Sequence, residues 1–99
     1  PGLLNFGSLN IDLVYRVPHI TRPGETLASA AFSRGPGGKG LNQSVAAARA
    51  GARVYHCGAV GADGGWLRDL LVAESVNCSF LALLPAQATG HAVIQVADS

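Results

Sequence analysis

The chain has 99 residues, of which 48% are hydrophobic and only 13% are charged, and its formal net charge at pH 7 is +1. That length suits one modest domain, and the absence of a basic run argues against a nucleic-acid or anionic-membrane partner. No apolar stretch approaches a membrane span, and the first residues lack the basic and long apolar regions of a signal peptide. The low charged fraction predicts that further chain or a partner covers some apolar surface.

Apolar runs and turn residues predict an alternating order of strands and helices. In chain order we expect strands at 3–7, 13–17 and 26–33, a helix at 41–50, a strand at 54–60, a helix carrying residues 67–74, and strands at 79–84 and 91–97. Asp63, in the turn before the second helix, is expected to cap it. We expect the leucine face of that helix, formed by Leu67, Leu70 and Leu71, to be only partly covered.

This alternation predicts an α/β layered fold with a partly parallel sheet. The segments 13–17 and 26–33 are extra to that core, and we expect them to form a flap. The two cysteines, Cys57 and Cys78, make neither a disulfide framework nor a zinc spacing, so we expect free thiols in a reducing, cytoplasmic environment. The three histidines, His19, His56 and His91, are scattered, and we expect surface or strand residues rather than metal ligands.

A glycine cluster at 35–40 leads directly into the first predicted helix and contains Lys39. A lysine at a helix N-terminus is unfavourable for the helix itself, because the exposed N–H groups there carry partial positive charge. The arrangement makes sense if Lys39 and those N–H groups face the oxygens of a ligand, which the glycines allow to approach the backbone. Asn42 and Gln43 add amide groups in the first turn. The alternative is a glycine-rich turn with a solvated lysine.

Two known glycine-rich motifs are alternative interpretations of this cluster. A phosphate-binding loop fails, because the first required glycine is missing and Gly40 follows Lys39. The dinucleotide pattern matches at Gly35, Gly37 and Gly40, and Asp63 lies at about the distance of a ribose-binding acid. Because helix capping explains Asp63 more simply, a dinucleotide-binding domain stays only as an alternative.

Asn10 and Asp12 follow the first predicted strand and are two residues apart. In an extended segment this spacing puts both side chains on one face. An amide beside a carboxylate can hydrogen-bond neighbouring hydroxyl groups, as carbohydrate recognition requires. The alternative is an ordinary Asx turn, and the two residues alone favour neither interpretation.

Several short sequence motifs occur in a characteristic order along the chain. They are Gly-Ser-Leu-Asn-Ile-Asp at 7–12, Pro-Gly-Glu-Thr at 23–26 and Gly-Gly-Lys-Gly-Leu-Asn-Gln-Ser-Val-Ala at 37–46, followed by Val-Gly-Ala-Asp at 60–63 and Thr-Gly at 89–90. Together they resemble the ribokinase-like (phosphofructokinase-B type) carbohydrate kinases along nearly the whole chain. Trp66 departs from the pattern, since ribokinases proper commonly carry glycine there, which bears on the substrate more than on the family.

The resemblance implies a ribokinase-like three-layer sandwich with a small β lid, of which residues 1–99 would be the N-terminal part, with lid segments at 13–17 and 26–33. It implies transfer of the γ-phosphate of ATP to a hydroxymethyl group of a sugar or nucleoside. Lid strands in relatives also form a dimer contact, so a homodimer is one expected partner arrangement. The implied substrate-binding residues are Asn10, Asp12, Gly37, Gly38, Lys39 and Asn42.

The resemblance also implies what these residues lack. In the family the catalytic base and the sites for the nucleotide, Mg²⁺ and a monovalent cation lie downstream, so we expect no catalytic residue and no metal site here. Asp12 is therefore not assigned as the base, and the fragment alone is expected to be inactive. A non-catalytic association module remains the third alternative.

Overall fold

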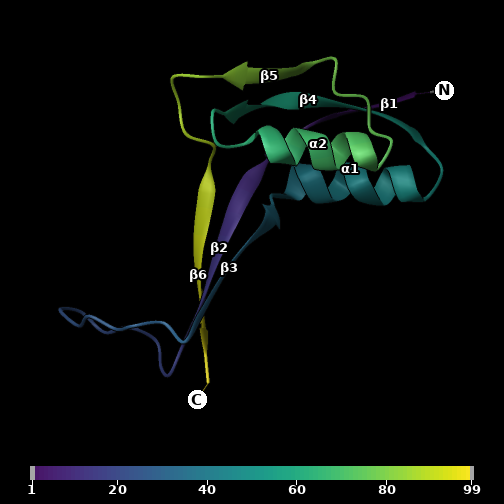
Figure 1. Ribbon diagram of the computed structural model, residues 1–99. Coiled ribbons are helices and arrows are strands. Elements are labelled where there is room, and N and C mark those ends of the chain that lie inside the picture. The colour runs from purple at the N-terminus through teal and green to yellow at the C-terminus, as the bar shows by residue number, and fades with distance from the viewer. Residues whose placement is uncertain (1, 99) are drawn as a thin grey trace.

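The computed structural model describes residues 2–98, which fold into two small sheets and two helices (Figure 1). The first sheet has the order β1-β4-β5 and is parallel throughout. The second has the order β3-β2-β6, in which β2 runs antiparallel to β3 and parallel to β6. The elements are β1 (Gly2–Phe6), β2 (Asn10–Val17), β3 (Ala31–Gly37), α1 (Lys39–Arg49), β4 (Arg53–Gly61), α2 (Gly65–Ala73), β5 (Leu81–Leu84) and β6 (His91–Ala97).

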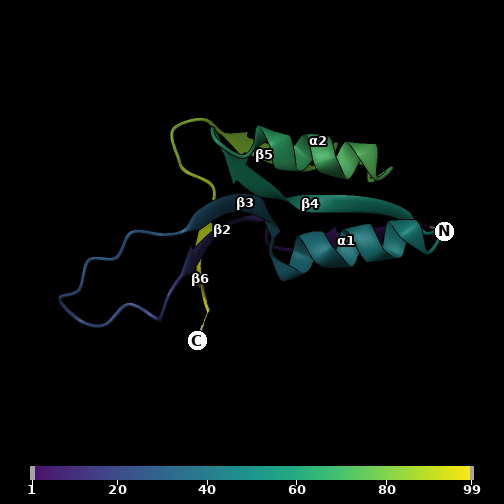
Figure 2. The same cartoon turned by 60° about the horizontal axis from the view of Figure 1, so that its bottom comes forward.

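The two helices lie side by side on one face of the parallel sheet, where they bury the core (Figures 1 and 2). Leu41 of α1 meets Val54 and Val60 of β4 in this layer, each at most 2% exposed. Leu67 and Leu71 of α2 are fully buried, so the prediction of a partly covered leucine face was wrong for these two residues. No helix within residues 2–98 is long and apolar enough to cross a membrane.

The opposite face of the parallel sheet carries exposed apolar side chains. Asn5 points toward α1, so its neighbours Leu4 and Phe6 point to the other face, where they are 65% and 82% exposed. Phe80 is 59% exposed, and its ring centre lies 6.3 Å from that of Tyr55. These side chains leave an apolar surface on the face that has no helix.

The β3-β2-β6 sheet extends away from the body, and we call it the projecting sheet (Figures 1 and 2). Its strands join the body at one end, where Asn10 pairs with Gly37 and Ile11 pairs with His91. β2 begins at Asn10, earlier than the predicted segment 13–17. The segment predicted at 26–33 is instead a strand at 31–37, which includes part of the glycine cluster. Pro36 is tolerated because β3 is an edge strand, where an N–H is not needed on the outer side.

Packing and one cation–π contact link the projecting sheet to the body: Ile11 of β2 is buried in the core of the body, and Leu13 packs against that core. The guanidinium group of Arg34, in β3, lies 4.8 Å from the centre of the Trp66 ring at the start of α2. This is a cation–π arrangement. The indole Nε1 of Trp66 is buried and has no hydrogen-bond partner within the part of the chain that the structure describes.

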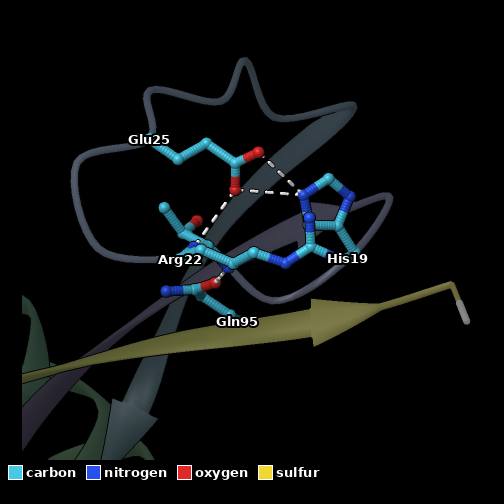
Figure 3. A network of polar contacts seen from close by, with 5 residues as sticks. His19, Arg22, Glu25 and Gln95 are labelled. Carbon is cyan, nitrogen blue, oxygen red and sulfur yellow. Dashed lines mark hydrogen bonds and ion pairs between the residues drawn. The ribbon is translucent and has the colours of Figure 1, made fainter.

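A polar network organises the long loop between β2 and β3 (Figure 3). The Nε2 atom of His19 lies 3.0 Å from both carboxylate oxygens of Glu25, and the Arg22 backbone N–H donates to Glu25 Oε1 at 3.1 Å. The backbone N–H of Arg22, followed by the His19 side chain, lowers the pKa of Glu25. Thr21 N–H donates to Gln95 Oε1 at 2.9 Å, which ties the loop to β6.

Candidate functional site

Asn10 and Asp12 lie at the body end of β2, on the same face of the strand, and both are half-buried. Neither side chain forms a hydrogen bond or ion pair within residues 2–98. Polar groups in partly buried positions are normally paired with protein, water or ligand. Both side chains therefore keep their hydrogen-bonding groups free for solvent or a ligand.

Glycines next to the pair let these two side chains approach the backbone. A Cβ atom on Gly37 would lie 2.2 Å from Asp12 Oδ1, and a Cβ on Gly90 would lie 2.8 Å from Asn10 Oδ1. The Asp12 carboxylate therefore lies directly against Gly37, and the Asn10 carboxamide lies against Gly90. Any larger residue at either glycine would displace the polar group that it faces.

The N-terminus of α1 packs closely on the turn between β1 and β2. Gly38 is the N-cap of α1 at φ +99°, and a Cβ there would lie 2.6 Å from the Ser8 carbonyl oxygen and 3.3 Å from the Asn10 nitrogen. Leu41 N–H donates to Ser8 O at 3.1 Å. One of the first-turn N–H groups that the sequence analysis assigned to a ligand is thus used by the protein itself. The same contact places the start of α1 beside Asn10.

Lys39 and Asn42 are exposed in the first turn of α1. Their side chains form no hydrogen bond or ion pair with the rest of the described chain. The structure therefore places Asp12 against Gly37 and Asn10 against Gly38 and Gly90. The side chains of Lys39 and Asn42 form no hydrogen bond or ion pair with this group. Asn42 instead lines a groove of about 340 Å³ between the helices, together with Pro36, Leu41, Val45, Ala46, Arg49, Leu70 and Glu74.

A buried polar network lies beneath the turn. His56 in β4 and Ser44 in α1 are both 0% exposed, and Ser44 Oγ lies 2.6 Å from His56 Nδ1. His56 Nε2 lies 3.0 Å from the Gly7 carbonyl oxygen. Asn5 Nδ2 donates to Ser44 Oγ at 2.9 Å and to Gly40 O at 2.8 Å. The network joins β1, α1, β4 and the turn that leads to Asn10.

Asp63 does not cap α2, contrary to the prediction: the N-cap is Gly64, and no side chain accepts a capping hydrogen bond there. Asp63 Oδ1 instead accepts from the Thr89 backbone N–H at 2.7 Å, and this bond is the main reason that the pKa of Asp63 is lowered. The buried Thr89 accepts in turn from Gly61 N–H at 2.8 Å through Oγ1. These bonds hold the segment that leads into β6, and Gly90 in that segment lies against Asn10.

Sequence reasoning missed Ser44, His56 and Thr89 as residues that support the site. A signal was present for two of them. Ser44 interrupts the apolar face of the first helix, three residues after Leu41, and His56 alternates with Val54 on the buried side of a strand. A polar residue on an apolar face indicates a buried hydrogen bond.

The two thiols are free, as predicted: Cys57 is half-buried and Cys78 is buried. Burial raises the pKa of the Cys78 thiol. Within residues 2–98, no group of three or more His, Cys, Asp or Glu side chains is arranged to hold a metal ion. Chemically, the site offers one carboxylate and one carboxamide whose hydrogen-bonding capacity is not used by other side chains within residues 2–98.

Comparison with known proteins gives consistent results. The chain is 41% identical over 95 residues to the ribokinase of Haemophilus influenzae, an alignment that covers 94% of this chain and 31% of that protein. The ribokinase of Cryptococcus neoformans, solved in complex with ADP, superposes with a TM-score of 0.88 at 44% identity and covers 98% of this chain. The ribokinase of Arabidopsis thaliana, complexed with ribose and ATP, superposes with a TM-score of 0.88 at 27% identity and covers all of it.

These comparisons confirm the ribokinase-like fold class. The chain spans 31% to 33% of the length of these three relatives, so it corresponds to one part of a longer fold. The family model for the pfkB family carbohydrate kinases matches residues 2–99. The chain therefore belongs to the pfkB family of carbohydrate kinases.

Proposed function

We propose that the complete enzyme transfers the γ-phosphate of ATP to a hydroxymethyl group of a sugar or related small molecule, and that this chain supplies the sugar-binding part. One observation carries the proposal. The side chains of Asn10 and Asp12 lie half-buried on one face of β2, against Gly90 and Gly37, and form no hydrogen bond within residues 2–98. A sugar with neighbouring hydroxyls would satisfy both groups.

The two side chains would divide the recognition of hydroxyl groups between them. The Asp12 carboxylate only accepts hydrogen bonds, so it would take the protons of two neighbouring hydroxyls. The Asn10 carboxamide both donates and accepts, so it would orient a third. Gly37 and Gly38 would form the floor, and Lys39 and Asn42 would reach the ligand from the first turn of α1. The projecting sheet would serve as the lid, and in the complete enzyme it would also form the contact between two copies.

We propose that the nucleotide, Mg²⁺, the monovalent cation and the catalytic base belong to the remainder of the enzyme. Mg²⁺ in phosphoryl transfer is held by one or two carboxylates together with the substrate phosphates and neutralises developing charge. In the ribokinase-like family these groups lie downstream of the part that this chain resembles, so the chain alone is not expected to turn over.

The proposal is tested with the full-length enzyme and an Asp12→Ala variant. Removing one partner of a buried hydroxyl costs about 1–3 kcal/mol, so ribose affinity measured by calorimetry should fall by about fivefold to about 150-fold, with ATP affinity unchanged. Asp69→Ala is the matched control, because Asp69 is an exposed carboxylate on α2. Unchanged ribose affinity in Asp12→Ala would contradict the site. Absence of ATP-dependent phosphorylation with ribose, fructose and nucleosides alike would contradict the activity.

A further inference from the structure

We propose that His56 is a positioning residue for the sugar site: its buried ring holds the carbonyl group of Gly7 and thereby places the turn that leads into Asn10. The kinetic part of the argument rests on the proposed function, whereas the structural part does not. His56 is 0% exposed and lies in β4, on the side of the sheet that faces α1. Because the ring is fully buried, any effect of His56 on binding must be indirect, through the turn at Gly7 or through Ser44 in α1.

The hydrogen bonds determine which ring nitrogen carries the proton. The Gly7 carbonyl oxygen can only accept, so His56 Nε2, at 3.0 Å, must donate. In the neutral ring Nδ1 is then an acceptor, and Ser44 Oγ donates to it at 2.6 Å. Ser44 Oγ in turn accepts from Asn5 Nδ2 at 2.9 Å. Every member has a partner of the right kind, as a buried network requires.

Gly7 is held on two sides by β4. Its N–H donates to Cys57 O at 3.2 Å, while its carbonyl oxygen accepts from His56. The next residue, Ser8, accepts the Leu41 N–H at 3.1 Å, and Leu9 is 3% exposed. The turn at residues 7–9 is thus fixed between β4 and the start of α1. A shift of Gly7 would move the start of β2 relative to the glycine floor.

The backbone around Gly7 leaves little space for another arrangement. A Cβ on Gly58 would lie 2.8 Å from Gly7 O and 3.3 Å from His56 Nε2. A Cβ on Gly40 would lie 2.5 Å from the Ser8 nitrogen. The absence of a side chain at Gly58 therefore leaves space for the hydrogen bond from His56 Nε2 to Gly7 O. An apolar side chain at position 56 would fill the volume but would leave the Gly7 carbonyl oxygen without its side-chain donor and the Ser44 hydroxyl proton without an acceptor, which is unfavourable in a buried position.

The kinetic test compares His56→Leu with His56→Gln in the full-length enzyme. Leucine removes the donor to Gly7 O, whereas the glutamine amide can supply an N–H in its place. We expect His56→Leu to raise the KM for the sugar about tenfold, the size expected for one lost hydrogen bond to a buried group, with the KM for ATP unchanged. His56→Gln should recover most of the loss. Val76→Ala is the matched control, because it removes buried core volume near the start of β4 without touching the turn.

A second readout is independent of activity. Amide exchange should accelerate in His56→Leu at Gly7 and Leu41, whose N–H groups bond to Cys57 O and Ser8 O, but not at Asn77, whose N–H bonds to Val54 O. If His56→Leu does not fold, the exchange rates of the Gly7, Leu41 and Asn77 amides are compared between the His56→Gln and Ser44→Ala variants. Unchanged exchange at Gly7 and Leu41 would overturn the proposal, as would a KM increase equal for sugar and ATP or one that Val76→Ala reproduces. If the wild-type enzyme phosphorylates no sugar, the proposed function fails, and the exchange experiment still decides the role of His56.

Discussion

At the scale of single residues, Gly7 and Gly40 set how closely the turn approaches α1. A Cβ on Gly40 would lie 2.4 Å from the Gly7 carbonyl carbon, which is backbone and cannot rotate away. We expect Gly40→Ala to lower the free energy of unfolding by about 1–3 kcal/mol, as overpacking does. The loss is measured by urea unfolding, as a lower denaturation midpoint with an unchanged slope m of the unfolding free energy against urea concentration.

Gly65→Ala is the control for this experiment. Gly65 is also in the first turn of a helix, but a Cβ there would meet nothing within 4 Å. Since alanine favours helix over glycine by about 1 kcal/mol, this variant should be neutral or more stable. Equal behaviour of the two variants would show that the close contact at Gly40 does not exist in solution.

The lowered pKa of Asp63 predicts that the stability of the protein depends on pH. The pKa of Asp63 in the folded chain is lowered from 3.8, chiefly because it accepts the Thr89 backbone N–H. A folded pKa below the unfolded one gives a stabilising contribution that is present above the unfolded pKa and is lost as pH falls through the folded pKa. Asp63→Asn keeps an oxygen acceptor but has no charge. Wild type should therefore be the more stable at neutral pH, and the difference should narrow in acid.

Thermal unfolding of both proteins between about pH 7 and about pH 2 checks this expectation. A stability difference that stays constant across this range would contradict it. Such a result would mean that the carboxylate charge of Asp63 does not contribute to holding the start of β6.

How much of the site was predictable depended on distance along the chain. Asn10 and Asp12 could be paired from sequence, because a spacing of two in an extended segment defines one face. Ser44 and His56 are 12 residues apart, and Asp63 and Thr89 are 26 apart. Their hydrogen bonds exist only because α1 packs against β4 and because the segment before β6 returns to the end of β4. The local sequence pattern carries no information about which distant segments pack together.

At the scale of elements, the helices and the strands of the body were predicted better than β3. The helices and the body strands have clear apolar periodicity, and the structure places them within a few residues of the expected bounds. β3 was displaced, because Gly35, Pro36 and Gly37 have turn-like composition yet pair with β2. Tertiary pairing overrides weak strand propensity at such an edge.

The loop between β2 and β3 also has a testable organisation. In Glu25→Ala the Arg22 N–H loses its acceptor at 3.1 Å, so its amide exchange should accelerate, while that of Ala30, which bonds to Arg16 O, should not change. Glu25→Gln keeps an oxygen acceptor and serves as the control. Nuclear magnetic resonance exchange rates are the measurement, and equal rates at Arg22 in all three proteins would show that Glu25 does not order the loop.

At the scale of the whole molecule, the charge and surface composition predict the behaviour of the 99-residue chain when produced alone. Leu4 and Phe6 are 65% and 82% exposed on the face without helices, and β1 is an edge strand. Apolar patches and unpaired edges both promote association. We expect the chain to self-associate at low micromolar concentration, as measured by sedimentation velocity.

Two charged substitutions provide the matched comparison. A Leu4→Lys, Phe6→Lys double variant should shift the sedimentation profile toward the monomer, because it removes the apolar patch and repels a second copy. A compact wild-type monomer with a cooperative melt would contradict the expectation. It would show that 99 residues are sufficient for an independent fold, and it would favour a self-standing binding module.

The stacking of Arg34 on Trp66 has a consequence for spectroscopy. Trp66 is the only tryptophan of this chain, and it lies where the projecting sheet meets the body. Indole emission responds to a nearby positive charge and to water. Any rotation of β3 that lifts the guanidinium group from the ring therefore changes the fluorescence of a single, unlabelled residue. The chain carries its own optical probe of the angle between its two sheets.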